Sequence, residues 1–242
     1  MTDLAISAVR GLPELREGDD LAQLIVERTE LQDGDVVVVA QKAVSKIEGR
    51  LVRLNEIVPS ARARDLAGDR DPRRLEAILR EAKRIVRTRE SLVIAETSHG
   101  FICASAGVDA SNAPEPGTLV LLPEDPDASA ARLRARVREL TRCEVGVVVS
   151  DSFGRPWRQG TTDVAIGASG VEVLRDLKGE RDPTGYELKT TVIATADEIA
   201  GAAELVMGKL DRVPVAIVRG PDARGDGTAQ ELVMPAERNL FT

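Results

Sequence analysis

Two short stretches of the chain are almost entirely apolar, and each stops abruptly at a polar segment. Residues 36–40 read VVVVA and residues 144–149 read EVGVVV. A short apolar run bounded by turn residues, such as QDGD at 32–35, is typical of a strand buried in the core. We therefore expect two buried strands. Polar groups just past such strands lie where ligands bind in many α/β proteins.

The remaining segments alternate between helical and extended patterns. Helices are predicted at residues 19–31, 71–87, 125–140 and 195–207, the last beginning with a capping box of Thr195 and Glu198. Strands are predicted at 36–40, 91–96, 101–106, 118–122, 144–149, 188–195 and 213–218. Because 91–96 and 101–106 pair locally as a hairpin, we predict an α+β fold with mixed sheets and flanking helices. Residues 1–242 form a single module, or two intimately packed subdomains with a seam near 150–170.

The composition restricts the chemistry. The chain of 242 residues has a formal net charge of −7, which argues against a general nucleic-acid binder. One histidine, His99, and two cysteines, Cys103 and Cys143, almost exclude structural zinc, so a bound metal should be a hard cation held by oxygen. His99 is expected in a solvated turn and both thiols are expected to be reduced and buried. No leader or membrane span is recognisable, so we expect a cytoplasmic protein.

Two lysines follow the first buried strand. The chain has only six lysines against 27 arginines, and Lys42 and Lys46 both fall in the segment QKAVSKIEGR, residues 41–50. In a helix they share one face, because positions four apart are neighbours. This arrangement suits phosphate binding by Lys46. The alternative is that the lysines only form the solvent-exposed start of a helix, which would give the same sequence pattern.

Two further segments carry oxygen-rich side chains. In AGVDASN, Asp109, Ser111 and Asn112 suit a hard cation or a sugar hydroxyl, with an ordinary Asx turn as the alternative. Asp151 ends the second buried strand and must meet a cation, an amide or water, because burying an unpaired carboxylate is costly. After it, Arg155 and Arg158 flank Trp157. The arginines suit a substrate phosphate or carboxylate, and the alternative is a structural ion pair with Asp151.

Taken together, these segments resemble one family, the coenzyme F420-0:L-glutamate ligases, also called gamma-glutamyl ligases. The matching stretches are GLPEL with EGDDL at 11–21, DGDVVVVAQKAVSKIEGR at 33–50, AGVDASN at 106–112, LLPEDPDASA at 121–130, SDSFGRPWRQG at 150–160, TADEIAGAAELVMGK at 195–209 and VPVAIVRG at 213–220. They cover nearly the whole chain in order.

The resemblance implies a GTP-dependent amide ligase that builds the gamma-linked glutamate tail of the deazaflavin coenzyme F420. The terminal carboxylate of F420-0 would take the gamma-phosphoryl group of GTP, and the amine of L-glutamate would then displace phosphate from the acyl phosphate. Magnesium or manganese, as two divalent ions, is implied, with potassium as a further ion. The resemblance also implies a gamma-glutamyl-ligase-like fold and an intertwined homodimer.

The same resemblance implies roles for individual residues. Catalytic roles fall on Lys46, Asp109 and Asp151; GTP contacts fall on Leu12, Pro13, Glu14, Leu15, Gln41, Lys46, Asn112, Met207, Gly208 and Lys209; metal contacts fall on Asp109, Asp151 and Ser152. Some family members carry an acidic residue in place of Lys209. Substrate contacts by Arg155 and Arg158 are our own interpretation of the residues and do not come from the family.

Two other functions fit the same motifs. One is a ligase for a different phosphorylated acid, which would differ only in its acceptor pocket. The other is a nucleotide-binding regulatory protein without turnover, against which the intact Lys46, Asp109 and Asp151 argue. Some relatives carry a C-terminal flavin-reductase-like domain that would begin near Thr242, so the sequence fits either a free-standing ligase or the N-terminal part of a longer chain.

Overall fold

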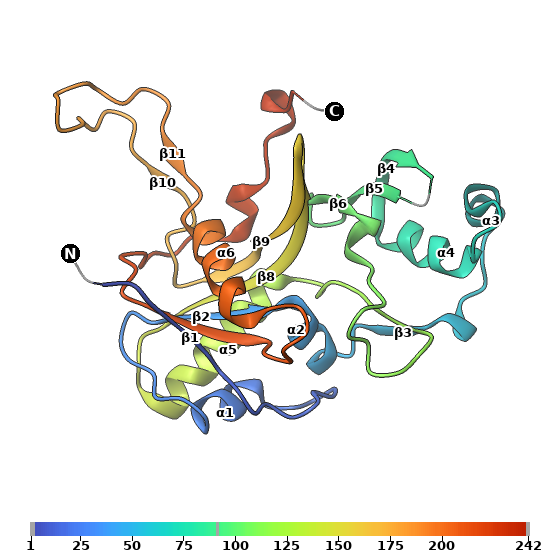
Figure 1. Cartoon of the computed structure of the whole chain (residues 1–242), viewed down its shortest axis with the longest axis horizontal. Helices are drawn as coiled ribbons and strands as arrows, with labels where there is room; N and C mark the ends of the chain where they lie inside the picture. The colour runs from blue at the N-terminus through green and yellow to red at the C-terminus, as the bar shows by residue number, and fades with distance from the viewer. Residues whose placement is uncertain (1–2, 91, 241–242) are drawn as a thin grey trace.

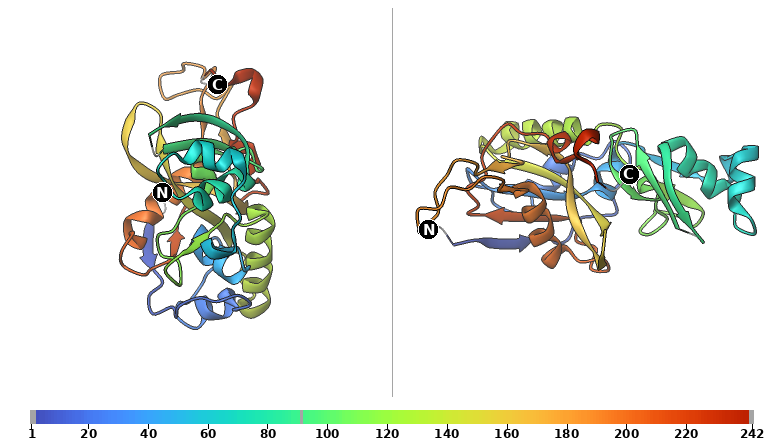
Figure 2. Two further views of the ribbon diagram at one scale, coloured as in Figure 1. Left: turned by 90° about the vertical axis from the view of Figure 1, so that its right-hand side faces the viewer. Right: turned by 90° about the horizontal axis from the view of Figure 1, so that it is seen from above.

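The structure is a computed structural model that describes residues 3–90 and 92–240. In chain order its elements are β1 (Ala5–Ala8), α1 (Leu21–Val26), β2 (Val36–Ala40), α2 (Gln41–Ile47), β3 (Leu51–Arg53), α3 (Ala61–Ala67), α4 (Pro72–Glu81), β4 (Ala82–Arg89), β5 (Leu92–Thr97), β6 (Ile102–Ala104), β7 (Thr118–Val120), α5 (Pro126–Thr141), β8 (Gly146–Arg155), β9 (Arg158–Ser169), β10 (Arg175–Asp176), β11 (Val192–Ile193), α6 (Thr195–Met207) and β12 (Val215–Arg219). They form a larger lobe around a central sheet and a smaller lobe from residues 51–121, which extends beyond one end of that sheet (Figures 1 and 2). The predicted mixed α+β class is confirmed.

The central sheet has five strands in the order β1-β12-β2-β8-β9. The two apolar runs are its neighbouring strands β2 and β8, which are parallel, with Val36 opposite Gly146 and Ala40 opposite Ser150. Every other pairing in this sheet is antiparallel. The pairing of β2 with β8 ends at Ala40 and Ser150, but β8 is longer than the predicted strand at 144–149 and continues to Arg155 along β9. The start of α2 and residues 150–152 of β8 therefore lie together at the end of the parallel pair.

Both faces of this sheet are buried, which explains why its central strands are apolar throughout. Val37 and Val39 pack with residues of α1 and α5, whereas Val36 and Val38 pack with residues of α6. Side chains alternate between the two faces of a strand, so a strand covered on both sides has no position for a solvated polar residue. Within residues 3–90 and 92–240, no helix combines the length and apolar composition needed to cross a membrane.

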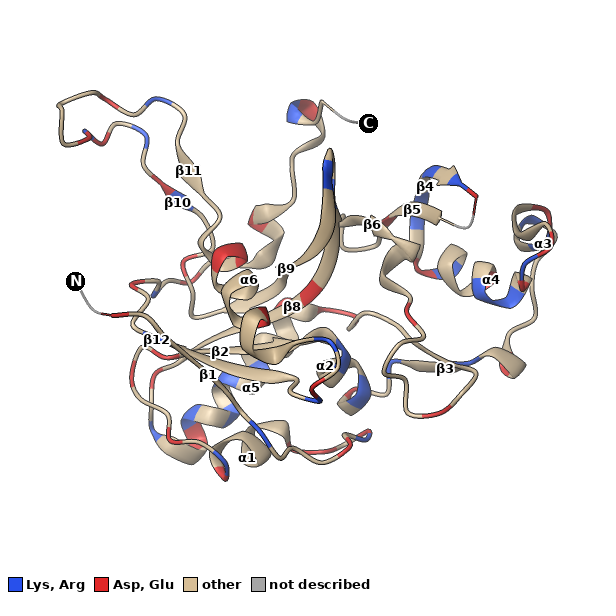
Figure 3. Ribbon diagram, viewed as in Figure 1, with Lys and Arg blue, Asp and Glu red and all other residues tan. Residues whose placement is uncertain are grey.

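The smaller lobe has its own hydrophobic core, in which α3 and α4 pack beside the sheet β4-β5-β6. The antiparallel pair β3–β7 connects this core to the larger lobe, and Arg50 adds polar links, donating to the carbonyl oxygen of Leu122 at 2.9 Å and to Glu81 at 2.8 Å. Figure 3 shows lysine and arginine gathered over α3, α4 and β4, with a second group on α2 where the lobes meet.

The helix predicted at 71–87 is too long. Asp71 caps α4 and Pro72 is its first residue, as expected, but the helix ends at Glu81. Residues 82–89 instead form β4, whose Ile85 lies opposite Ala95 of β5. Pairing with β5 satisfies the backbone groups of this segment, so tertiary contact overrides the helical spacing of its apolar residues.

Other boundaries also differ from the prediction. The helix expected at 19–31 is limited to α1, and the strand expected at 188–195 is reduced to β11. The capping box is wrong: Ala194 is the N-cap residue of α6, and the Thr195 hydroxyl is buried without a partner among the described residues. The sequence pattern also missed β1 and β9. The other predicted helices, at 125–140 and 195–207, are confirmed as α5 and α6.

The hairpin predicted at 91–106 is confirmed as β5–β6, although Ser91, where it was expected to begin, lies outside the described residues. His99 in its turn is half-buried, so the expectation of a solvated side chain is met only in part. Its ring stacks on Phe101 at 5.6 Å, and its Nε2 lies 3.0 Å from the carbonyl oxygens of Pro123 and Glu124. Cys103 is buried as expected, whereas Cys143 is half-buried; both are free thiols. Residues 151–170 form most of the β8–β9 hairpin, and the division into subdomains stays a prediction.

One buried ion pair joins the start of β2 to the end of β12. Asp35 is 1% exposed and accepts hydrogen bonds from Arg219 at 2.8 and 2.7 Å and from the backbone N–H of Gln32 at 2.8 Å. A carboxylate at this depth depends on its partners, because its charge has lost the hydration that it has in the unfolded chain.

Replacing Arg219 with Met should therefore lower the free energy of unfolding by about 2 kcal/mol, because the buried Asp35 carboxylate loses two charge-assisted hydrogen bonds from a side chain that is itself 41% exposed. Urea denaturation followed by circular dichroism measures this. Arg73→Met is the matched control, since Arg73 pairs with Asp71 on the surface at 2.7 Å and its loss should leave the urea midpoint unchanged. Equal effects of the two substitutions would contradict the prediction.

Candidate functional site

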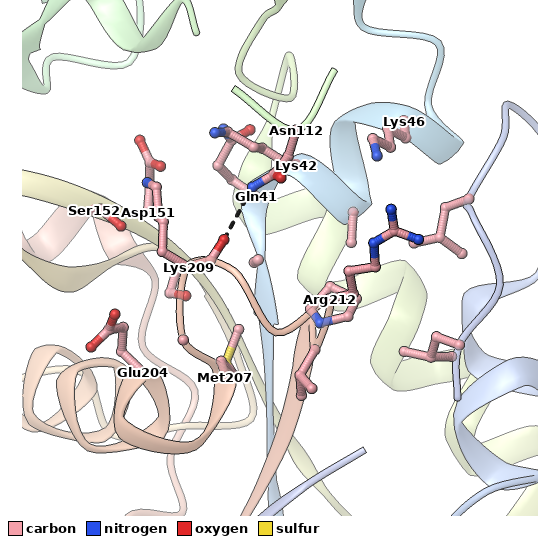
Figure 4. A pocket seen from close by; sticks show the side chains of 18 of the residues that line it. Gln41, Lys42, Lys46, Asn112, Asp151, Ser152, Glu204, Met207, Lys209 and Arg212 are labelled. Carbon is pink, nitrogen blue, oxygen red and sulfur yellow. Dashed lines mark hydrogen bonds between the residues drawn. The ribbon is translucent and has the colours of Figure 1, made fainter. Parts of the chain in front are cut away.

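A cavity of about 420 Å³ lies at the carboxyl end of β2, beside the middle of β8 (Figure 4). Segments far apart in the sequence line it: the loop after β1, the start of α2, the loop at 112–114, residues 150–152 of β8, one residue of β9, and the end of α6 with the loop after it. Twelve of the residues predicted for the site line this cavity: Leu12, Pro13, Glu14, Leu15, Gln41, Lys46, Asn112, Asp151, Ser152, Met207, Gly208 and Lys209. The fold thus brings the separate motifs together around one space.

Helix α2 begins directly after β2 and supplies both lysines to the cavity. The side chains of Lys42 and Lys46 are only 14% and 11% exposed. At the first residue of the helix, the Oε1 of Gln41 accepts a hydrogen bond from the Ser45 hydroxyl at 2.9 Å, whereas its buried Nε2 has no partner among the described residues. Helix α2 therefore presents two cationic groups and one unused amide donor to the cavity, which suits an anionic, oxygen-rich ligand.

Asp109 comes from the smaller lobe and meets α2 at the edge of the cavity. Its backbone N–H and carbonyl pair with Val120 at 3.0 and 2.8 Å, which holds the residue against β7. Its carboxylate lies 2.5 Å from the Nζ of Lys42 and also accepts from Ser111. Burial opposes the charge on this carboxylate, but the hydrogen bonds from Lys42 and Ser111 outweigh it and hold the pKa of Asp109 well below its usual range.

Asp151, in the middle of β8, is in the opposite situation. Burial raises the pKa of Asp151 to about 7, with the nearby charge of Asp163 adding to the effect and the backbone N–H of Ser152 and the charges of Lys42 and Lys209 opposing it. No ion pair joins Asp151 to Arg155 or Arg158 among the described residues, so the alternative of a structural ion pair is wrong. Asp151 is a half-buried carboxylate, and no ion pair of it with a cationic side chain is found in the described part of the chain.

Asp163, which the sequence analysis missed, lies next to Asp151. It is 6% exposed and accepts hydrogen bonds from the Ser150 hydroxyl at 2.9 Å and the Ser152 hydroxyl at 2.7 Å. It reaches this position because β9 folds back along β8, with Asp163 opposite Ser152. A prediction of β9 would have placed it there, but the polar stretch after Asp151 gave no clear strand pattern.

The segment after α6 closes another side of the cavity. Gly208 ends the helix with φ +60°, and a Cβ there would come within 2.3 Å of the Asp211 carboxylate, so only glycine fits. The Asn112 side-chain amide lies 3.5 Å from the carbonyl oxygen of Lys209, which joins this loop to the smaller lobe (Figure 4). Glu204 and Arg212 also line the cavity and were not predicted.

Arg155 and Arg158 do not line the cavity. They lie opposite each other near the exposed tip of the β8–β9 hairpin, where Arg155 donates to the carbonyl oxygen of Gln159 at 3.0 Å. Their contact with a substrate stays a prediction.

Lys42 lies in the predicted phosphate-binding segment at 41–50, but of the two lysines there the sequence predicts a role only for Lys46. The contact with Asp109 joins residues 67 positions apart, which spacing alone does not reveal. Both lysines of α2 therefore belong to the site, with Lys46 paired to Glu14 at 2.5 Å.

The raised pKa of Asp151 makes a prediction about stability. Because the folded state favours the protonated carboxyl, ionising Asp151 destabilises the wild-type protein as the pH rises from about 4 to 7. Asp151→Asn should therefore raise the free energy of unfolding of the metal-free protein at pH 8 by about 3 kcal/mol and have little effect near pH 4. Thermal and urea unfolding at both pH values measure the difference.

Asp163→Asn is the matched control for that experiment. In the wild type, each oxygen of the Asp163 carboxylate accepts a hydrogen bond from a serine hydroxyl. The substitution replaces one of these acceptors with an amide group and should therefore destabilise the protein at both pH values. A loss of stability in Asp151→Asn at pH 8 would contradict the interpretation of Asp151 as an uncompensated charge.

Known proteins match the chain along nearly its whole length. The model of the family described as F420-0:Gamma-glutamyl ligase matches residues 11–220. The Coenzyme F420:L-glutamate ligase of Methanopyrus kandleri is 50% identical over 236 residues, which cover 94% of this chain and 93% of that relative. The proteins of the same name from Methanothermobacter thermautotrophicus and Methanocaldococcus jannaschii are each 43% identical, over 98% and 95% of this chain and 98% and 94% of their own lengths. The chain therefore belongs to the F420-0:gamma-glutamyl ligase family.

Proposed function

We propose that the protein is a GTP-dependent ligase that joins L-glutamate to coenzyme F420-0 through an acyl phosphate, releasing GDP and phosphate. The observation that carries the proposal is the convergence of the family's motifs on one cavity, with three lysines and the carboxylates of Asp151 and Asp163 on its walls. Small-molecule substrates fit a cavity of about 420 Å³, which is within the usual size of a ligand site.

The residues present fit a hard divalent cation. Asp109, Asp151 and the Ser152 hydroxyl offer only oxygen, the donor type that magnesium and manganese prefer. Burial raises the pKa of Asp151 despite the charges of Lys42 and Lys209, and a bound cation would stabilise the ionised carboxylate. The described residues form no preassembled group of three or more acidic, histidine or cysteine ligands. Protein oxygens would thus fill part of the coordination shell and leave the rest to water and phosphate, as is usual for magnesium.

We propose two divalent ions, magnesium or manganese, with Asp109 and Asp151 holding one and Ser152 contacting the other, and potassium as a further ion. When bound, these ions would neutralise the triphosphate and the charge that develops on the transferring phosphoryl group. The chain's own part is to bind and orient. Lys46 would contact a phosphate, and the free Nε2 of Gln41 would donate to an oxygen of the nucleotide.

Two chemical steps follow from this arrangement. A carboxylate oxygen of F420-0 attacks the gamma-phosphorus of GTP, so that the bond to the beta-phosphate oxygen breaks and GDP leaves. The amine of L-glutamate then attacks the acyl carbon, phosphate leaves and the amine proton is lost to water or a site carboxylate. The buried walls around Asp151 and Asp163 would limit water at the acyl phosphate, which otherwise hydrolyses.

The experiment combines GTP, magnesium or manganese, L-glutamate and F420-0 with the protein and follows both GDP release and product mass. The wild type should give products heavier by glutamyl units, and the same assay with EDTA should give none. Asp151→Asn should reduce the rate by at least about a hundredfold, because one ion loses a charged ligand.

Arg73→Met, which changes the smaller lobe's surface far from the cavity-lining residues, is the control and should keep wild-type activity. GTP binding without any glutamylated product would reject F420-0 as the acceptor. Glutamylation of another phosphorylated acid under the same conditions would then identify a different ligase.

A further inference from the structure

The two lysines of α2 are four positions apart and line the same cavity, yet they have different partners. Lys46 pairs with Glu14, whose side chain is 57% exposed on the loop after β1. Lys42 pairs with Asp109 of the smaller lobe and lies 2.5 Å from the Ser111 hydroxyl as well. Only Lys42 is therefore in contact with a carboxylate that the proposed function assigns to a metal.

The Asp109 carboxylate already has three hydrogen bonds in this arrangement. Its Oδ2 accepts from Lys42 and from the Ser111 hydroxyl at 2.7 Å, and its Oδ1 accepts from the Ser111 backbone N–H at 2.9 Å. The Lys42 side chain is 14% exposed and that of Asp109 is 37% exposed, so water screens this pair only in part. A cation can approach Oδ2 closely only if the ammonium moves away.

The charge of Lys42 also acts on Asp151, the other proposed ligand, where its effect is larger than that of Lys209. One ammonium thus partly compensates both carboxylates at once. This is the electrostatic task that a divalent cation would perform between the same two side chains.

We infer that Lys42 occupies the place of the divalent cation at Asp109 in the metal-free protein, so that metal binding must displace its ammonium group. This inference rests on the proposed function, because that function assigns the cation to Asp109. A divalent cation bound at Asp109 would repel the Lys42 ammonium group. A triphosphate in the cavity would offer that ammonium group phosphate oxygens as new partners. Metal alone should therefore bind weakly, and metal with nucleotide should bind well.

Once displaced, Lys42 remains anchored at the second residue of α2, on the wall of the cavity. Its flexible stem carries three donors that can turn toward phosphate oxygens. The same residue would then act twice, first as an internal counter-ion and later as a positioning group for the nucleotide. Lys46 has no such exchange to make, because its partner Glu14 is not one of the metal contacts.

The test measures binding of Mn²⁺ alone to the nucleotide-free protein, by calorimetry and by the electron paramagnetic resonance signal of free Mn²⁺. If Lys42 holds Asp109 about nine-tenths of the time, the apparent Kd is roughly tenfold weaker than that of a site without the lysine. Lys42→Met should therefore bind Mn²⁺ about tenfold more tightly than the wild type. Lys42→Gln is the second variant, in case the methionine variant folds poorly, and should change the Kd in the same direction.

Lys46→Met is the matched control, because it removes one positive charge from the same cavity without touching Asp109. Its Kd for Mn²⁺ alone should stay within about twofold of the wild type. Lys42→Arg, which keeps the charge, should also bind Mn²⁺ as weakly as the wild type.

Equal tightening in Lys42→Met and Lys46→Met would overturn the inference, since general charge would then explain it. Unchanged or weaker Mn²⁺ binding in Lys42→Met would overturn it too, because Lys42 would then support the metal site instead of competing with the metal. A second readout concerns the nucleotide: the affinity of Lys42→Met for GTP in saturating Mn²⁺ should fall.

These outcomes are separate from those for the proposed function. Binding of Mn²⁺ requires neither F420-0 nor glutamate, so a protein that fails to glutamylate F420-0 can still show the exchange at Asp109. Conversely, an active ligase whose Lys42→Met variant binds Mn²⁺ no better than the wild type would keep its function and lose this inference.

Discussion

The parallel pairing of β2 with β8 is the constraint on which the site depends. Their pairing ends at Ala40 and Ser150, where α2 begins, while β8 continues through Asp151 to Arg155 along β9, so the start of α2 lies beside Asp151. The parallel pair thus brings together side chains from two distant parts of the chain without any contact between them being needed for folding. A shift of one residue would turn Asp151 to the other face of the sheet and remove it from the cavity.

The sheet places three carboxylates away from bulk water, and they differ in their partners. Asp163 accepts hydrogen bonds from two serine hydroxyls and Asp35 pairs with Arg219. Asp151 has no side-chain partner among the described residues, and burial raises its pKa. The proposed metal ligand is therefore the carboxylate among the three whose charge the surrounding side chains stabilise least.

Local patterns in the sequence were sufficient for elements whose environment is simple. The VVVVA run predicts β2 because both of its faces are covered, and Asp125 with Pro126 marks the start of α5 because capping is a local effect. The same reasoning failed at residues 82–87, where pairing with β5 decides the conformation, and at Thr195, where the cap lies one residue earlier. Asp163 was missed for a related reason: its position follows from the register of β8 with β9, and no local pattern encodes that register.

The contact between Lys42 and Asp109 also explains how a site shared by two lobes can stay assembled without its ligand. Asp151 lies on the central sheet, whereas Asp109 is held by β7 of the smaller lobe, so the distance between these two carboxylates depends on how the lobes are placed. Two carboxylates facing one cavity repel each other, and that repulsion would tend to separate the lobes. The ammonium group of Lys42, anchored on α2, attracts both carboxylates and so replaces this repulsion with a net attraction between the lobes. The lysine that competes with a cation for Asp109 is thus the same group that keeps Asp109 where a cation can use it.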